Sequence, residues 1–176
     1  DLKSPAAEKY RHQACKIGRP FKIAVGCING KAVSTTTWKG KVVLIDFWAT
    51  WCPPCVASVP KLVQLYQTNH AKGLEVLGIS NDSSLPALKE FLAGHKEMVW
   101  PESFGPSGRN GWHSLAPQMW IEAIPTTFLI DRNGILREIQ TGFLDEALVN
   151  QLLDEPVKAD APSDATAKAS SPATPA

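Results

Sequence analysis

Two cysteines three positions apart are the residues of this chain whose types and spacing suggest chemistry most directly. Cys52 and Cys55 enclose two prolines, Pro53 and Pro54. Cysteines at this spacing can form a disulfide with each other, and the thiolate of one can attack a disulfide of another molecule. The pair therefore predicts thiol–disulfide exchange.

The flanking sequence predicts the elements that position this pair. Residues 42–45 read Val-Val-Leu-Ile, a continuous apolar run typical of a strand that is covered on both faces. From Val56 onward, apolar residues recur at helical spacing. We expect a strand, a short turn and a helix, with Cys52 as the helix N-cap. Prolines at the next two positions fit, because the first helical N–H groups lack intrahelical partners in any case.

A helix N-terminus predicts different roles for the two thiols. The helix dipole favours negative charge at Cys52, and the N–H group of Cys55 is the nearest donor to a Cys52 thiolate. Both effects lower the pKa of the Cys52 thiol, and the thiolate is the reactive form. We therefore expect Cys52 to be the attacking thiol and Cys55 the resolving thiol.

Other uses of a cysteine pair fit the sequence less well. A structural zinc site needs four ligands, usually as two short-spaced pairs, whereas Cys15 and Cys27 lie far apart and no His-x₃₋₅-His pair exists. Covalent haem attachment needs a histidine directly after the second cysteine, where Val56 stands. No metal and no other cofactor is predicted, and a purely structural Cys52–Cys55 disulfide is the remaining alternative.

The run Phe-Trp-Ala-Thr-Trp-Cys-Pro-Pro-Cys over residues 47–55 resembles the active-site signature of the thioredoxin superfamily. Its form is most similar to the exported TlpA/ResA-like branch, and the resemblance covers roughly residues 18–154. It implies an α/β, thioredoxin-like fold with a central mixed β-sheet flanked by helices. An added N-terminal β-hairpin is expected over residues 21–33, with a two-residue turn at Asn29-Gly30.

The chain divides into three expected parts. Residues 1–19 form a polar N-terminal arm, residues 20–155 the thioredoxin-like domain, and residues 156–176 an Ala/Pro/Ser-rich tail that we expect to be disordered. Residues 97–122 are expected to be irregular apart from a short helix over 114–120, with His113 on the surface.

Asp46 stands in the strand that precedes the cysteines. Burial disfavours the charged carboxylate, so its pKa should rise. The resemblance implies that Asp46 accepts the proton of Cys55, directly or through water. The alternative is an aspartate that is paired elsewhere or lies at the strand edge.

The segment Ile124-Pro125 resembles the cis-proline loop that faces the cysteine pair in this superfamily. A cis X-Pro bond is accessible at modest cost, and the backbone of Ile124 could then pair with an extended substrate segment. The resemblance implies that Trp51, Pro53, Ile124 and Pro125 contact the substrate.

Two comparisons with related families narrow the expected activity. ResA-like proteins carry a glutamate three residues after the second cysteine, where this chain has Ser58. This difference weakens the case for assigning a ResA-type role in cytochrome maturation to this chain. Peroxiredoxins share the fold but need Thr or Ser, and a proline, at the positions held here by Ala49 and Ile45. Peroxidase activity is therefore disfavoured.

Composition limits the class of partner. The chain has 176 residues, a net charge of +1 and 44% hydrophobic residues, which fits one domain with a full core. Near-neutral charge argues against nucleic acid or an anionic membrane surface as the main partner, and no apolar run is long enough to form a transmembrane segment. The expected partners are protein disulfides and an upstream electron donor such as a membrane thiol reductant.

The even cysteine count and the resemblance together predict an extracytoplasmic, periplasmic location. There Cys15 and Cys27 would form a structural disulfide, and two free buried thiols are the alternative. Any export signal or membrane anchor would lie upstream of Asp1. We expect a protein-disulfide reductase, with a disulfide oxidase and a non-enzymatic holdase or adaptor module as alternatives.

Overall fold

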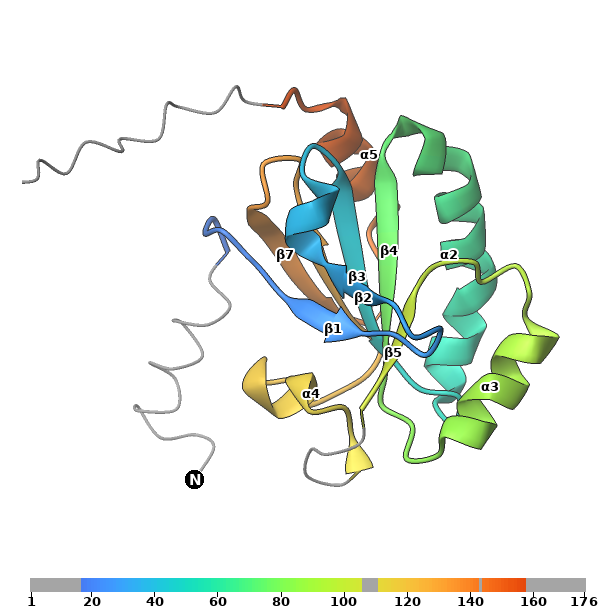
Figure 1. Cartoon of the computed structure of the whole chain (residues 1–176). Coiled ribbons are helices and arrows are strands. Elements are labelled where there is room, and N and C mark those ends of the chain that lie inside the picture. The colour runs from blue at the N-terminus through green and yellow to red at the C-terminus, as the bar shows by residue number, and fades with distance from the viewer. Residues whose placement is uncertain (1–16, 106–110, 143, 158–176) are drawn as a thin grey trace, which may run out of the picture.

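The computed structural model describes residues 17–105, 111–142 and 144–157. Its centre is a five-stranded mixed sheet with the order β5-β4-β3-β6-β7 (Figure 1). The strands are β3 (Val42–Trp48), β4 (Leu74–Ser80), β5 (Glu102–Phe104), β6 (Thr126–Ile130) and β7 (Leu136–Thr141). β3, β4 and β5 run parallel, whereas β6 and β7 are antiparallel to their neighbours. The expected α/β, thioredoxin-like architecture is confirmed.

Helices cover both faces of this sheet. They are α2 (Pro53–Asn69), α3 (Leu85–Gly94), α4 (Leu115–Gln118) and α5 (Glu146–Asp154), with the short 3₁₀ segments η1 (Thr35–Trp38) and η2 (His70–Lys72). Leu44 and its neighbours pack against α2 and α5 on one face, while Ile45 and Phe47 pack against α4 and the N-terminal hairpin on the other. This double coverage explains why every residue of β3 is buried.

The N-terminal hairpin is confirmed, and it consists of β1 (Ala24–Gly26) and β2 (Ala32–Ser34). The expected two-residue turn is wrong. The Cys27 N–H group donates to the Lys31 carbonyl oxygen, so the loop holds three residues, and only Gly30 adopts a positive φ, of 79°. Asn29 instead uses its side-chain oxygen to accept a hydrogen bond from the Lys31 N–H group.

The segment expected to be irregular contains an edge strand, β5. Glu102 and Ser103 are buried, and the Gly78 N–H group donates to the Pro101 carbonyl oxygen at the start of the pairing. A three-residue strand has no periodicity of its own, which is why no sequence pattern indicates it. The short helix in this segment is confirmed, although α4 covers only Leu115–Gln118.

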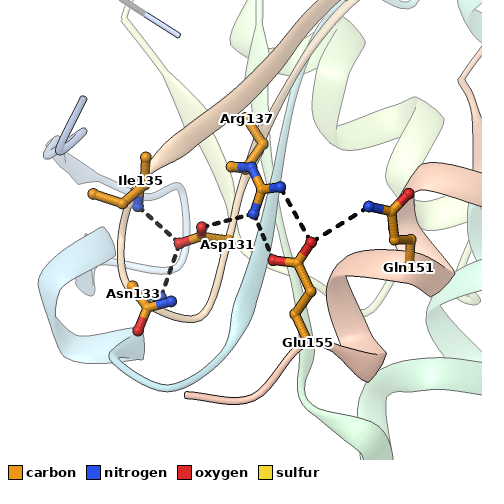
Figure 2. A network of polar contacts seen from close by, with 6 residues as sticks. All are labelled: Asp131, Asn133, Ile135, Arg137, Gln151 and Glu155. Atoms are coloured by element: carbon orange, nitrogen blue, oxygen red, sulfur yellow. Dashed lines mark hydrogen bonds and ion pairs between the residues drawn. The ribbon is translucent and has the colours of Figure 1, made fainter. Parts of the chain in front are cut away.

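A polar network joins the end of α5 to the turn between β6 and β7 (Figure 2). Arg137 donates to Asp131 Oδ2 at 3.1 Å and, through both terminal nitrogens, to the carboxylate of Glu155. Asp131 Oδ1 accepts hydrogen bonds from the backbone of Asn133 and Ile135. Arg137 therefore connects the C-terminal helix to the sheet.

Replacing Arg137 with alanine should lower the free energy of unfolding by about 1–2 kcal/mol, because it leaves the buried Asp131 carboxylate without its cation. Urea unfolding at neutral pH measures the change. The exposed Lys89→Ala variant on α3 is the control and should unfold like the wild type. An Arg137→Ala midpoint equal to that of the wild type would contradict this role.

Candidate active site

The turn between β3 and α2 is held in place from the segment that follows β4. Thr50 donates to Asp82 twice, from its backbone N–H group at 3.1 Å and from its hydroxyl group at 2.6 Å, and Ser80 donates to the other carboxylate oxygen at 2.8 Å. Asp82 is 2% exposed. Sequence reasoning missed this residue, although a polar Ser-Asn-Asp run directly after a buried strand is a usable signal.

The structure confirms the expected placement of the two cysteines. Cys52 is the N-cap of α2, with Pro53 and Pro54 in the first turn, and its sulfur accepts a hydrogen bond from the Cys55 N–H group at 3.3 Å. The two sulfurs form a disulfide, with the Cα atoms 5.3 Å apart. The N-terminal end of α2 therefore presents one backbone donor and its positive dipole end to the Cys52 sulfur.

The loop before β6 brings a distant part of the chain to this disulfide. The Ile124–Pro125 peptide bond is cis, and the Ile124 carbonyl oxygen lies 3.8 Å from Cys52 Sγ. Trp51 is 55% exposed and Pro53 is also exposed, whereas Cys52 is buried. Three of the four residues expected to contact substrate, Trp51, Pro53 and Ile124, thus adjoin Cys52.

Asp46 lies in a small pocket that Pro125 also lines. The pocket has a volume of about 80 Å³, and Ser58, Lys61 and Thr127 contribute to its walls. Burial raises the pKa of Asp46 to about 7. In the part of the chain that the structure describes, Asp46 Oδ1 and Thr127 Oγ1 have no hydrogen-bond partner. The lining of this pocket is mostly apolar, and the two oxygens without partners are groups to which a water in it could bond.

Ser58 stands where the resemblance to ResA-like proteins led us to look for a glutamate. Its hydroxyl donates to the Cys55 carbonyl oxygen at 2.7 Å, within the first turns of α2. Ser58 therefore brings no second carboxylate to the pocket, which leaves Asp46 as the acid that lines it.

Glu102 is a second buried acid that sequence reasoning missed. Its carboxylate accepts hydrogen bonds from two indole groups, Trp48 Nε1 at 3.0 Å and Trp100 Nε1 at 2.9 Å. Burial raises the pKa of Glu102 to about 8. The negative charge of Asp46 also raises this pKa, whereas the two hydrogen bonds lower it. The sequence gives no sign that Glu102 is buried, because the three-residue strand in which it lies is not recognisable from the sequence.

The expectation that His113 lies on the surface is wrong. The ring is 5% exposed, with Nε2 3.0 Å from Ser103 Oγ, and Nδ1 accepts a hydrogen bond from the Leu115 N–H group. Burial lowers the pKa of this histidine. Its position joins α4 to β5, a tertiary contact that the local sequence does not encode.

The Cys15–Cys27 disulfide stays a prediction, because Cys15 lies outside the described residues. Cys27 itself is buried and has no disulfide partner among the described residues, and burial and the negative charge of Glu102 raise the pKa of its thiol. It forms an isolated β-bridge with Ser103 at the edge of the sheet.

Residues 17–105, 111–142 and 144–157 were compared with two kinds of feature, a cluster of metal-ligating side chains and a membrane-spanning helix. These ranges contain no group of three His, Cys, Asp or Glu side chains arranged to hold a metal ion. None of the helices within them is long and apolar enough to cross a membrane.

Comparison with known proteins places this geometry in a family. The Redoxin family profile matches residues 16–153. The chain is 30% identical over 114 residues to the thiol-disulfide oxidoreductase ResA of Bacillus thuringiensis subsp. konkukian (strain 97-27), an alignment that covers 64% of this chain and 62% of that protein. The match thus spans less than two thirds of that relative. The chain is 32% identical over 129 residues to ResA of a Bacillus cereus strain, covering 73% and 69%.

A solved structure shows the same likeness. The crystal structure of a putative thiol:disulfide interchange protein DsbE from Chlorobium tepidum aligns with a TM-score of 0.66 and 30% identity, over 78% of this chain and 95% of that chain. The matched family profile, the sequence relatives and this structural neighbour agree with the Cys52–Cys55 geometry. The chain therefore belongs to the Redoxin family, as a TlpA/ResA-like member of the thioredoxin superfamily.

Proposed function

We propose that this chain is a thiol–disulfide oxidoreductase that acts on protein substrates. The observation that carries the proposal is the Cys52–Cys55 disulfide at the N-terminus of α2, with the Ile124 carbonyl oxygen 3.8 Å from the Cys52 sulfur. The names of the relatives, thiol-disulfide oxidoreductase and thiol:disulfide interchange protein, support it.

The reaction begins from the dithiol form. The Cys52 thiolate attacks one sulfur of a substrate disulfide, a Cys52–substrate bond forms, and the first substrate thiolate leaves. The Cys55 thiolate then attacks the Cys52 sulfur and releases the second substrate thiolate. Two electrons pass from the enzyme to the substrate, the two enzyme thiol protons are released, and the two substrate thiolates take up two protons. Cys52 and Cys55 end as a disulfide.

Surrounding groups assist each step. The Cys55 N–H group and the dipole of α2 stabilise the Cys52 thiolate. Asp46, with its pKa raised to about 7, accepts the Cys55 proton through water in the pocket and returns it to solvent. An aspartate with such a pKa can exchange a proton in either direction near neutral pH.

Substrate binding is proposed for Trp51, Pro53, Ile124 and Pro125. The exposed Trp51 indole offers an apolar surface beside Cys52. The backbone of Ile124 can pair with an extended substrate segment, which would place the substrate disulfide over the cysteine pair. This mode is tolerant of sequence and suits a protein that acts on several disulfides.

The same likeness supports a proposal about the direction of the reaction and the location of the protein. We infer a reductase in an extracytoplasmic, periplasmic compartment, supplied by an upstream electron donor such as a membrane thiol reductant. Disulfide reduction in such a compartment needs a donor, because the active-site pair leaves each cycle oxidised.

Titration of the Cys52–Cys55 pair against dithiothreitol and glutathione buffers tests the proposal. A potential near about −270 mV or lower is expected for a reductase, whereas a value near about −120 mV would assign an oxidase. Tryptophan fluorescence follows the titration, since Trp48 belongs to the same packed cluster as both cysteines. A Cys15→Ser/Cys27→Ser variant is the control and should give the same potential. A pair that equilibrates with neither buffer would overturn the redox function and favour a binding module.

A further inference from the structure

Three neighbouring strands place two acids and a glycine in one row. Asp46 on β3 is paired with Gly78 on β4, and Gly78 is paired with Glu102 on β5. Residues paired in register across a sheet direct their side chains to the same face. Both acids therefore belong to the face that packs against α2, the helix that carries the cysteines. The middle position of the row has no side chain.

The Glu102 side chain occupies the space that Gly78 leaves. A Cβ atom built on Gly78 would collide with both oxygens and the Cδ atom of the Glu102 carboxyl group. The carboxyl group thus lies over β4, and its Oε2 atom accepts a hydrogen bond from the indole N–H group of Trp48 on β3. Glu102 therefore extends from the edge strand to the central strand.

Trp48 connects this carboxyl group to the redox pair. Its side chain is 2% exposed and belongs to the same packed cluster as Cys52, Cys55 and Leu88. The other carboxyl oxygen of Glu102 accepts from Trp100, so both oxygens are used by neutral donors. Trp48 thus belongs to the packed cluster of the redox pair and also donates a hydrogen bond to the Glu102 carboxyl group.

The charged groups around the row make the two acids depend on each other. The negative charges of Asp46 on β3 and Asp82 after β4 both oppose the ionisation of Glu102. The negative charge of Glu102 in turn raises the pKa of Cys27 in the hairpin loop. From α2, Lys61 lines the pocket of Asp46 and pairs with Glu146 of α5 at 2.9 Å. Two buried acids that interact release their protons in two coupled steps.

We propose that Glu102 is a positioning residue of the thiol–disulfide site, which holds the Trp48 indole behind the cysteines and forms with Asp46 a buried acid pair whose two ionisations are coupled across Gly78. The inference rests on the proposed function only in taking Asp46 as the group that accepts the proton of Cys55. In this arrangement ionisation of either acid makes ionisation of the other less favourable, which limits the negative charge beneath the disulfide.

Carboxyl-carbon NMR titration of the oxidised full chain, ¹³C-labelled at Asp and Glu, tests the coupling without depending on catalysis. Asp46→Asn should lower the apparent pKa of Glu102 by about one unit, since it removes a negative neighbour. Glu102→Gln should convert the titration of Asp46 into a single step and should stop the Trp48 indole N–H signal from moving near the pKa of Glu102. Glu138→Gln, a half-buried glutamate on β7, is the matched control and should change neither titration.

The outcomes separate the inference from the proposed function. If Glu102 titrates identically in the wild type and in Asp46→Asn, the acid pair is overturned, and this arm remains decisive even when Glu102→Gln fails to fold. The expected functional result concerns the rate of disulfide exchange in Glu102→Gln. Its pH profile should shift and fit a single ionisation. Coupled titrations in a protein that performs no exchange would support the acid pair and overturn the proposed function alone.

Discussion

Replacing Cys52 with serine is expected to lower the rate of disulfide reduction by about three orders of magnitude or more. A serine hydroxyl is not ionised near neutral pH, so the N–H group of Cys55 and the dipole of α2 have no anion to stabilise. Reduction of a disulfide-linked, fluorescence-quenched peptide by the pre-reduced protein gives the rate.

Cys55→Ser should behave differently, because Cys52 is retained. The first attack proceeds and the mixed disulfide with the substrate accumulates, since no resolving thiol follows. Mass spectrometry of the acid-quenched reaction should show one substrate per chain for Cys55→Ser and none for Cys52→Ser. Cys27→Ala, at a cysteine outside this site, is the control and should keep the wild-type rate. Full activity of Cys52→Ser would favour the holdase or adaptor alternative.

Asp46→Asn should make the protein more stable than the wild type at alkaline pH. Burial raises the pKa of Asp46 from 3.8 to about 7, so the folded state binds this proton more tightly than the unfolded state does. The resulting stability is fully present below pH 3.8, and it is lost as the pH rises to about 7. The total is roughly 4 kcal/mol, at about 1.4 kcal/mol for each unit of pKa shift.

Urea unfolding of the oxidised protein at about pH 4 and pH 8 measures this effect. The free energy of unfolding of Asp46→Asn, relative to the wild type, should increase by roughly 4 kcal/mol between the two values. Asp154→Asn, at an exposed position on α5, is the matched control and should show a far smaller change. An equal response of both variants to pH would mean that folding does not raise the pKa of Asp46. Glu102, whose pKa is raised to about 8, acts in the same direction, so the wild type should lose further stability as the pH rises to about 8.

The redox turn was predictable because its signals are local. A covered strand reads as a continuous apolar run, prolines in a first helical turn mark the start of α2, and Cys52 and Cys55 are one turn apart on the same helix. The burial of Asp46 followed from its place in that strand. The approach of Ile124 to Cys52 was expected from the resemblance, although the two residues are 72 positions apart.

The residues that surround the redox turn were decided by tertiary structure alone. β5 is too short to show a periodicity, and Glu102 is buried only because this strand pairs with β4 opposite Gly78. Asp82 and His113 are likewise buried by contacts with segments that are distant in the sequence. The sequence by itself determined the chemistry of the cysteine pair, since helix-start and strand signals act over a few residues. Only the strand register, which depends on how non-local segments pack, determined that a second acid lies beside Asp46.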